Sequence, residues 1–384
     1  KSTLIQMLAK GKHAAQYLTL DDLGTLGAAQ RDPEGFVAGL SGPVAIDEIQ
    51  RAPELLLTIK AEVDRRRKPG RFLLTGSAHV LSLPRLADTL AGRMEVLTLW
   101  PLSQGEIDRV KESFLDQLFS DGAIALSARR GPTSDDVFRR VFRGGYPEIT
   151  RRAKSERQRA WFEAYLNTIM QRDVRDLANI AGLAELPRLL DILAARAGGL
   201  INYADLARDA GLNQVTLKRY FTLLSAVFLV VTIRPWFSNR IKRIMKSERL
   251  YLADTGLLAH LLDIGPQDLV GDPRAKGALL ENFVAVELLK QQGWSKVRPQ
   301  MFHYRDYSGA KVDFVLESPG RKKIVGIEVK AAATVRPSDF KGLRQLSEVL
   351  GPTFHRGVVL YTGQQVVPFA ENLHAVPVHH LWAT

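Results

Sequence analysis

Residues 42–50 read GPVAIDEIQ, and this stretch decides the fold of the first part of the chain. It is a short apolar run that ends in two carboxylates, Asp47 and Glu48, a pattern typical of a buried strand with a polar tip. A helical pattern follows at 53–66, and a second apolar strand, RFLLTG, follows at 71–76. Because strand and helix patterns alternate, we expect an α/β fold with a parallel sheet.

The ends of these strands carry groups suited to phosphate chemistry. Two carboxylates at a strand tip, Asp47 and Glu48, can hold Mg²⁺ through water and polarise an attacking water. The next strand ends in the polar residues Thr75 and Ser77. By itself, a strand that ends in Asp-Glu can equally be an ordinary solvated strand end. The neighbouring motifs therefore decide whether these carboxylates indicate phosphate chemistry.

The chain begins with Lys1, Ser2 and Thr3 at the start of a helix expected over 1–10. A Lys followed by Ser or Thr is the end of the phosphate loop G-x-x-x-x-G-K-[ST], in which Lys neutralises the β- and γ-phosphates and the hydroxyl binds Mg²⁺. The glycines of that loop are not in the sequence and there is no initiator Met, so we expect the numbering to begin inside a longer chain. The three motifs together indicate nucleotide binding.

A helix-turn-helix pattern lies at 200–220, with Gly211 at the turn and Asn213 capping the second helix. An apolar helix end and strand at 223–233 and a basic stretch at 234–249 follow, so the segment resembles a winged helix-turn-helix. Such a module docks on DNA with its second helix in a groove, and also occurs as a lid or protein-interaction module. The candidate groove-facing residues are Gln214, Thr216, Lys218 and Arg219, and the candidate phosphate contacts are Arg240, Lys242, Arg243 and Lys246.

The last part of the chain contains a short motif of two carboxylates and a lysine. A strand over 311–316 carries Asp313, and a strand over 324–330 places Glu328 and Lys330 on one face. This D…ExK order resembles the PD-(D/E)xK nuclease core, which implies carboxylates that hold Mg²⁺ and a Lys that positions water. Glu281, on a helix over 277–291, matches the extra acidic position of that fold. An inherited scaffold, or a charge pair that closes a sheet face, is the alternative. A helix at 338–350 and a final strand at 357–361 complete the expected elements.

Five motifs extend these observations over nearly the whole chain: IDEIQRAPEL (46–55), FLLTGS (72–77), LAGR (90–93), GGYPE (144–148) and DTGL (254–257). With them the chain resembles the AAA+-like ATPases of bacteria and archaea that carry a C-terminal domain of unknown function. The resemblance implies ATP and Mg²⁺ at Lys1, Ser2, Asp47 and Glu48, and a γ-phosphate sensor at Thr75 and Ser77. It makes Arg93 a candidate for contacting phosphate, with a surface or structural role as the alternative.

Composition limits the partners and the metal chemistry. The 384 residues include 53 Lys and Arg against 41 Asp and Glu, a net charge of +12 that favours nucleic acid, nucleotide phosphates or an anionic membrane as partner. There is no Cys, which excludes disulfides, thiolate zinc sites and Cys nucleophiles. The most apolar run, 223–233, is too short to cross a bilayer, so we expect no membrane association and a cytoplasmic protein. We expect His379 and His380 at the surface.

These observations lead to a three-part organisation. We expect a P-loop AAA+-like ATPase core at 1–120, a helical region with a winged helix at 121–249, and a nuclease-like α/β domain at 250–384. The favoured function is that of an ATPase that acts on or with DNA. A homo-oligomer is compatible with this function. The alternative is an ATP-switched signalling or scaffold protein whose C-terminal domain binds but does not cleave.

Overall fold

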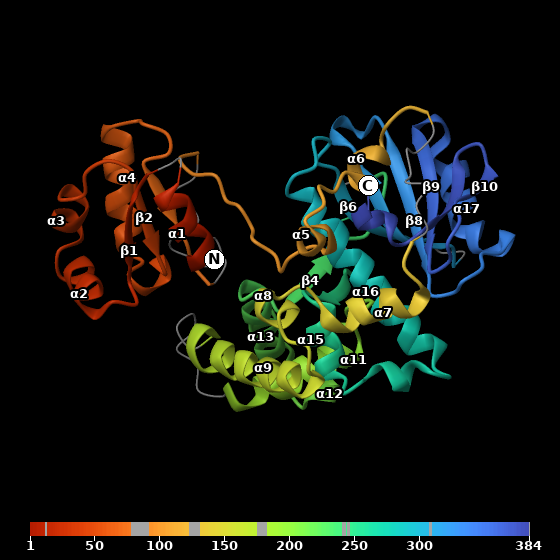
Figure 1. The fold of residues 1–384 in the computed structure, drawn as a ribbon, viewed down its shortest axis with the longest axis horizontal. Helices are drawn as coiled ribbons and strands as arrows, with labels where there is room; N and C mark the ends of the chain where they lie inside the picture. The colour runs from red at the N-terminus through yellow and green to blue at the C-terminus, as the bar shows by residue number, and fades with distance from the viewer. Residues whose placement is uncertain are drawn as a thin grey trace. The chain divides into compact units, whose positions relative to one another are not determined.

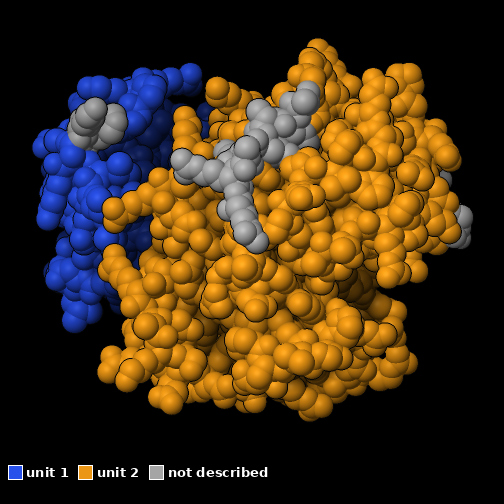
Figure 2. Space-filling view, turned by 45° about the vertical axis from the view of Figure 1, so that its right-hand side comes forward, with its two compact units in different colours: residues 1–99, 167–183, 221–228 blue, residues 100–166, 184–220, 229–384 orange. Residues whose placement is uncertain are grey.

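A computed structural model describes residues 1–383 with gaps at 12–13, 78–91, 123–130, 175–182, 240–242, 244–245 and 307–308. Its contacts divide the chain into two units, coloured in Figure 2. Unit 1 comprises Lys1–Leu99, Asn167–Leu183 and Phe221–Phe228, and unit 2 comprises Trp100–Leu166, Ala184–Tyr220 and Leu229–Thr384. In the part of the chain that is described, no helix combines the length and apolar character needed to span a membrane.

Unit 1 is built around a three-stranded parallel sheet in the order β1-β2-β3, as the alternating sequence pattern predicts (Figure 1). Apolar side chains of β2 and of the helices form its core, with Ile46, Leu55 and Ile59 almost fully buried. Asp22 caps the second helix by accepting a hydrogen bond from the Thr25 amide. The elements are α1 (Ser2–Lys10), β1 (Gln16–Thr19), α2 (Leu23–Arg31), α3 (Pro33–Ala38), β2 (Val44–Asp47), η1 (Ile49–Arg51), α4 (Leu55–Arg65) and β3 (Phe72–Leu74).

The segment that follows residue 99 packs with unit 2, although the sequence pattern predicts an ATPase core that extends to residue 120. Its backbone amides donate to side chains of the long helix α16 (Pro273–Gln292): Gln104 N to Glu287 Oε2 at 2.9 Å, and Leu115 N to Gln291 Oε1 at 3.2 Å. Sequence periodicity does not reveal such long-range hydrogen bonds. The helices of this region are α5 (Gln104–Asp108), α6 (Phe114–Gln117), α7 (Ser134–Arg143), α8 (Pro147–Thr150) and α9 (Ser155–Thr168).

The middle region contains a helix on each side of Gly211, where the sequence pattern indicates them. Helices α12 (Tyr203–Ala210) and α13 (Gln214–Ala226) are joined at Gly211, whose φ of 70° lies in the left-handed region that favours glycine. Asn213 accepts a hydrogen bond from the Thr216 amide at 2.8 Å, as a capping residue does. Helix α11 (Leu186–Ala195) precedes them, and the antiparallel strands β4 (Val230–Ile233) and β5 (Arg249–Leu252) follow.

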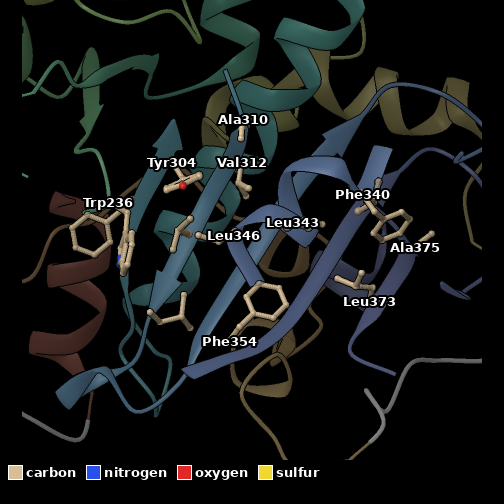
Figure 3. Packing of buried hydrophobic residues seen from close by; sticks show 14 of the residues in the cluster. Trp236, Tyr304, Ala310, Val312, Phe340, Leu343, Leu346, Phe354, Leu373 and Ala375 are labelled. Carbon is tan, nitrogen blue, oxygen red and sulfur yellow. The ribbon is translucent and has the colours of Figure 1, made fainter. Parts of the chain in front are cut away.

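The C-terminal part contains a six-stranded mixed sheet in the order β10-β11-β9-β8-β7-β6. Strands β7 and β8 lie where the sequence predicts them, but β9 is not the final strand, because a short antiparallel pair follows it. Leu343 and Leu346 of α17 lie against the sheet beside Phe354, as Figure 3 shows. The elements are α15 (Thr255–Leu261), β6 (Gln300–Arg305), β7 (Lys311–Glu317), β8 (Ile324–Lys330), α17 (Lys341–Leu350), β9 (Phe354–Tyr361), β10 (Val367–Ala370), β11 (Leu373–Pro377) and α18 (His380–Ala383).

His379 and His380 correct one expectation, because both are buried rather than at the surface. Their rings lie 4.3 Å apart between centroids, and burial lowers the pKa of each to about 4. Near the chain end the sequence offers no strong periodicity from which to infer this burial.

Two of the short motifs meet in a tight backbone junction. The buried carboxylate of Asp254, in DTGL, accepts hydrogen bonds from Gly145 N at 2.7 Å and from Leu257 N at 3.0 Å. Gly145, in GGYPE, also accepts a hydrogen bond from Leu102 N at 2.8 Å, and a Cβ on Gly145 would lie 2.1 Å from the Leu102 carbonyl oxygen. At this position only glycine fits, which explains why the motif carries it.

Candidate functional site

Asp47 is the centre of a polar cluster at the carboxyl edge of the unit 1 sheet. It ends β2 and is only 3% exposed. Tyr17 donates its hydroxyl to Asp47 Oδ2 at 2.8 Å, and Thr75 donates to Oδ1. Burial raises the pKa of Asp47, but hydrogen bonds from Thr75, Ser2 and Tyr17 outweigh burial and hold its pKa below the usual value. The carboxylate is therefore ionised and fixed in place.

The start of α1 brings the expected phosphate-loop residues to the same edge. The Ser2 side chain lies close enough to Asp47 to lower the pKa of its carboxyl, and Lys1 donates its ammonium group to the Gly76 carbonyl oxygen at 2.9 Å. A hydroxyl next to a carboxylate is a pair of hard oxygen donors of the kind Mg²⁺ prefers. Ser2 and Asp47 therefore fit the predicted metal, and Lys1 lies beside the loop that follows β3. Thr3 is exposed on α1.

Glu48 directly follows the buried strand in an unusual backbone conformation. Its φ of 60° and ψ of 43° are left-handed, a geometry that non-glycine residues adopt rarely and that is common at functional sites. Gln50 donates its amide to Glu48 Oε2 and to Ser77 Oγ, the latter at 3.0 Å. Gln50 thus connects two predicted site residues, Glu48 and Ser77, that lie on different segments of the sequence.

Arg93 lies against α4. Its guanidinium donates to Asp64 Oδ1 at 2.7 Å, and both side chains are about one third exposed. The Asp64 carboxylate raises the pKa of Arg93, so the guanidinium remains charged. The observed pairing agrees with a structural role for Arg93, which is the alternative to the predicted phosphate contact. The preceding residues of the LAGR motif, 90–91, lie outside the described residues.

In unit 2, the D…ExK residues come together on two neighbouring strands. Phe314 of β7 pairs with Ile327 of β8, which places Asp313 and Glu328 across from each other. Asp313 Oδ2 accepts a hydrogen bond from Val329 N at 3.0 Å, and Lys330 donates to Glu328 Oε1 at 2.7 Å. The sequence motif therefore forms one buried polar cluster.

Glu281 joins this cluster from α16, together with a cation that the sequence motif does not predict. Arg249 Nη1 lies 2.8 Å from Glu281 Oε1 and 3.3 Å from Asp313 Oδ1, and Tyr251 donates its hydroxyl to Glu281 Oε1 at 2.8 Å. Burial and the charge of Asp313 raise the pKa of both Glu281 and Glu328, to about 7 in each case. Over the described ranges of the chain, no group of three His, Asp or Glu side chains is arranged to hold a metal ion.

The predicted DNA-contacting residues fall into three groups. Gln214, Lys218 and Arg219 are exposed on the first turns of α13, with Thr216 partly exposed, and Lys246 is exposed after β4. Arg240 and Lys242 lie outside the described residues. The structure does not support the prediction that Arg243 contacts phosphate, because this residue is only 7% exposed. Its guanidinium pairs with the buried Glu317 at 2.7 Å and lies over the rings of Trp236 and Phe302. A run of basic residues in a sequence indicates positive charge, but it does not indicate which of the side chains is buried.

Four residues of these two clusters were not singled out from the sequence: Tyr17, Gln50, Arg249 and Tyr251. Gln50 lies two residues after Glu48, and this closeness to the Asp-Glu pair is a sequence signal that could have identified it as a site residue. The other three lie on strands whose register with the acidic residues becomes visible only in the folded chain.

Comparison with known proteins identifies the parts of the chain. A family described as an AAA domain matches residues 1–108, a domain of unknown function (DUF8612) matches 134–268, and a second one (DUF4143) matches 276–381. No solved structure matches the chain.

Similar curated proteins come from bacteria and an archaeon. "Uncharacterized protein Rv2008c" of Mycobacterium tuberculosis and "Uncharacterized protein Mb2031c" of Mycobacterium bovis are each 30% identical over 100% of this chain and 79% of their own length. "Uncharacterized protein MJ1544" of Methanocaldococcus jannaschii is 23% identical over 73% of this chain and 64% of its own. The chain therefore belongs to the family of the two mycobacterial proteins, and it combines an N-terminal AAA domain, of the ATPase type, with a C-terminal DUF4143 domain.

Proposed function

We propose that this chain binds and hydrolyses ATP at the carboxyl edge of the unit 1 sheet. The observation that carries the proposal is that Ser2, at the start of α1, lies close enough to Asp47, at the end of β2, to lower the pKa of its carboxyl. A hydroxyl at a helix start and a carboxylate at a strand end are the protein ligands of Mg²⁺ in P-loop ATPases. Mg²⁺, when bound there, would neutralise charge on the nucleotide phosphates. The AAA domain match at 1–108 supports the same proposal.

Each residue of the cluster has a role in this proposal. Lys1 binds phosphate through its ammonium group, and Ser2 and Asp47 supply oxygen ligands. Glu48 orients the attacking water and accepts its proton, while Thr75 and Ser77 contact the γ-phosphate from the neighbouring strand. Gln50 holds the Glu48 carboxylate through its amide.

Asp47→Ala is expected to weaken ATP binding in the presence of Mg²⁺ by about tenfold or more, because the ordered carboxylate ligand is lost. Affinity for ATP in EDTA should change little. Binding is measured by titration with a fluorescent ATP analogue, using the longest natural form of the protein that contains this chain. Asp64→Ala on α4 is the matched control and should bind as the wild type does. An Asp47→Ala protein with unchanged Mg²⁺-dependent affinity would contradict the proposed site.

We further propose that the middle region is a winged helix that contacts DNA. In support, α12 and α13 are separated by a short turn at Gly211, β4 and β5 form an antiparallel pair, and Leu200, before α12, bridges antiparallel to β5. The exposed Lys218 and Arg219 on α13 and the net charge of +12 favour a polyanion partner.

The double substitution Lys218→Ala and Arg219→Ala is expected to weaken duplex DNA binding several-fold. If both residues contact phosphates, the slope of log affinity against log salt should fall by about 2, since each phosphate contact contributes roughly 0.9. Fluorescence anisotropy from 50 to 200 mM salt measures both quantities. Lys341→Ala with Arg344→Ala, two exposed residues of α17, is the charge-matched control. Equal slopes for the two double variants would count against α13 as the DNA-facing helix.

A second candidate function is an ATP-switched scaffold whose nuclease-like domain binds without cleaving. The Arg249 guanidinium between Glu281 and Asp313 favours it, because a protein cation already balances these carboxylates. The order of Asp313, Glu328 and Lys330 on β7 and β8 still supports a likeness to the PD-(D/E)xK core.

Asp313→Ala separates the two functions. In the nuclease version, wild-type protein cleaves linear, branched or single-stranded DNA in Mg²⁺, and Asp313→Ala abolishes cleavage because a metal ligand is lost. In the scaffold version, gel assays detect no cleavage that depends on Asp313. Wild-type cleavage that is absent from Asp313→Ala would reject the scaffold version.

A further inference from the structure

Gln50 lies in the short helical turn η1, and hydrogen bonds fix the backbone on both sides of it. Ile49, the preceding residue, is only 1% exposed in the core of unit 1, and its amide donates to the Thr75 carbonyl oxygen at 2.8 Å. The amide of the following residue, Arg51, donates to the Glu48 carbonyl oxygen at 3.0 Å. The side chain of Gln50 therefore extends from a fixed position next to the carboxylates of the proposed ATP site.

The hydrogen bonds of the Gln50 amide group define its orientation. Its Nε2 atom donates to Glu48 Oε2 and to Ser77 Oγ, the latter at 3.0 Å. The reversed orientation would place the amide oxygen against a carboxylate oxygen, and neither of these atoms can donate a hydrogen bond. Gln50 Oε1 is therefore the acceptor atom of the group, and it is buried without a hydrogen-bond partner among the described residues.

This unpaired oxygen lies close in the chain to a second unfavourable feature. The backbone of Glu48, two residues earlier, is left-handed at φ 60°. Strained backbone and unpaired buried polar atoms both cost free energy, and both are typical of functional sites, where a substrate or a water supplies the missing contact. Water is a hydrogen-bond donor small enough to reach a buried oxygen. Gln50 Oε1 therefore fits the water that Glu48 is proposed to activate.

We propose that Gln50 is a catalytic residue, whose Oε1 atom accepts a hydrogen bond from the attacking water while Glu48 accepts the other hydrogen of that water. This inference rests on the ATPase function proposed above. Two fixed acceptors hold the lone pair of the water in one direction, which lowers the entropic cost of attack. Because Gln50 uses a lone pair of the Ser77 hydroxyl, the O–H of Ser77 can still donate to the γ-phosphate.

The reaction step assigns both hydrogens of the water. The water oxygen forms a bond to the γ-phosphorus, and the bond from the γ-phosphorus to the oxygen that bridges to the β-phosphate breaks. The electron pair of the broken bond stays with ADP. One proton of the water passes to Glu48, and the other hydrogen stays on its oxygen as a hydroxyl of inorganic phosphate, hydrogen-bonded to Gln50 Oε1.

The test compares Gln50→Met, which has a similar length but lacks the amide, with the wild type, in the longest natural form of the protein that contains this chain. Turnover is expected to fall by about tenfold to 100-fold. Affinity for ADP–tetrafluoroaluminate, which mimics the transition state, should fall by the same factor, whereas affinity for ADP–beryllium trifluoride, which mimics bound ATP, should stay within about twofold. Both affinities are measured by calorimetric titration in Mg²⁺. The matched control is Gln16→Met, at an exposed position that begins β1.

Gln50→Lys separates the acceptor from the donor role. The Lys ammonium group can donate to Glu48 and Ser77 but accepts no hydrogen bond, so the same loss of turnover is expected. Wild-type turnover in Gln50→Lys or in Gln50→Met would overturn the proposal, because the acceptor would then be dispensable. Equal losses of affinity for both fluoride complexes would also overturn it, because Gln50 would then shape the whole site rather than contact the water.

The wild-type protein distinguishes failure of this role from failure of the proposed function. A wild type that hydrolyses ATP no faster than Gln50→Met would remove only the role of Gln50. A wild type that neither binds nor hydrolyses ATP would overturn the proposed function together with this role.

Discussion

Glu48→Gln is expected to lower the ATPase turnover number by about 100-fold or more while leaving ATP affinity close to that of the wild type. The amide cannot accept a proton from the attacking water, and general bases commonly contribute 10²- to 10⁴-fold. The substitution is otherwise conservative, because Gln has the same length and the left-handed backbone at φ 60° is tolerated equally by both residues. Steady-state phosphate release and titration with an ATP analogue measure the two quantities.

The matched control for this experiment is Glu54→Gln. Glu54 lies six residues along the chain, at the start of α4, and its side chain makes no capping hydrogen bond. It should retain wild-type turnover, so any loss in Glu48→Gln is not a general effect of charge removal near the strand. Equal turnover in wild type and Glu48→Gln would remove the role assigned to Glu48.

Gly145→Ala is expected to destabilise unit 2 by about 3 kcal/mol, since overpacking against fixed atoms typically costs about 1–3 kcal/mol and occasionally more. The new Cβ would lie 2.1 Å from the Leu102 carbonyl oxygen, which belongs to the backbone and cannot rotate away. Any shift of Gly145 would also disturb its hydrogen bond to the buried Asp254 carboxylate.

Urea unfolding followed by tryptophan fluorescence reports this effect selectively. All five Trp residues of the chain belong to unit 2, so the signal follows that unit alone: Trp100, Trp161, Trp236, Trp294 and Trp382. Gly277→Ala on α16 is the control, because its Cβ would meet no atom within 4 Å and alanine favours a helix by up to about 1 kcal/mol. A Gly145→Ala midpoint at or above that of the wild type would contradict the packing argument.

The sequence predicts those features that depend on neighbouring residues. Apolar runs locate β2, β3, β7 and β8, and Gly211 and Asn213 locate the turn between α12 and α13 and the cap of α13. The same short-range patterns, an apolar run and the two-residue periodicity of a strand, predict that Asp47 ends a strand and that Glu328 and Lys330 lie on one face of a strand.

Features that depend on distant partners could not be predicted in this way. Arg249 is 32 residues from Glu281 and 64 from Asp313, and Tyr17 is 30 residues from Asp47. For Arg243, nothing in the basic run indicates that its guanidinium turns inward to Glu317. Each of these contacts is set by how strands and helices pack, which hydrophobic periodicity alone does not specify.

The hydrogen bond from Gln104 to Glu287 has a consequence for biosynthesis. The two residues are 183 positions apart, so at roughly 5–20 residues per second the ribosome needs about 10–40 s to make the second after the first. During that interval the segment around Gln104 and Leu115 has no α16 against which to pack. Until α16 is made, Phe114 and Leu115, which are buried in the folded chain, lack the helix to which this segment is hydrogen-bonded.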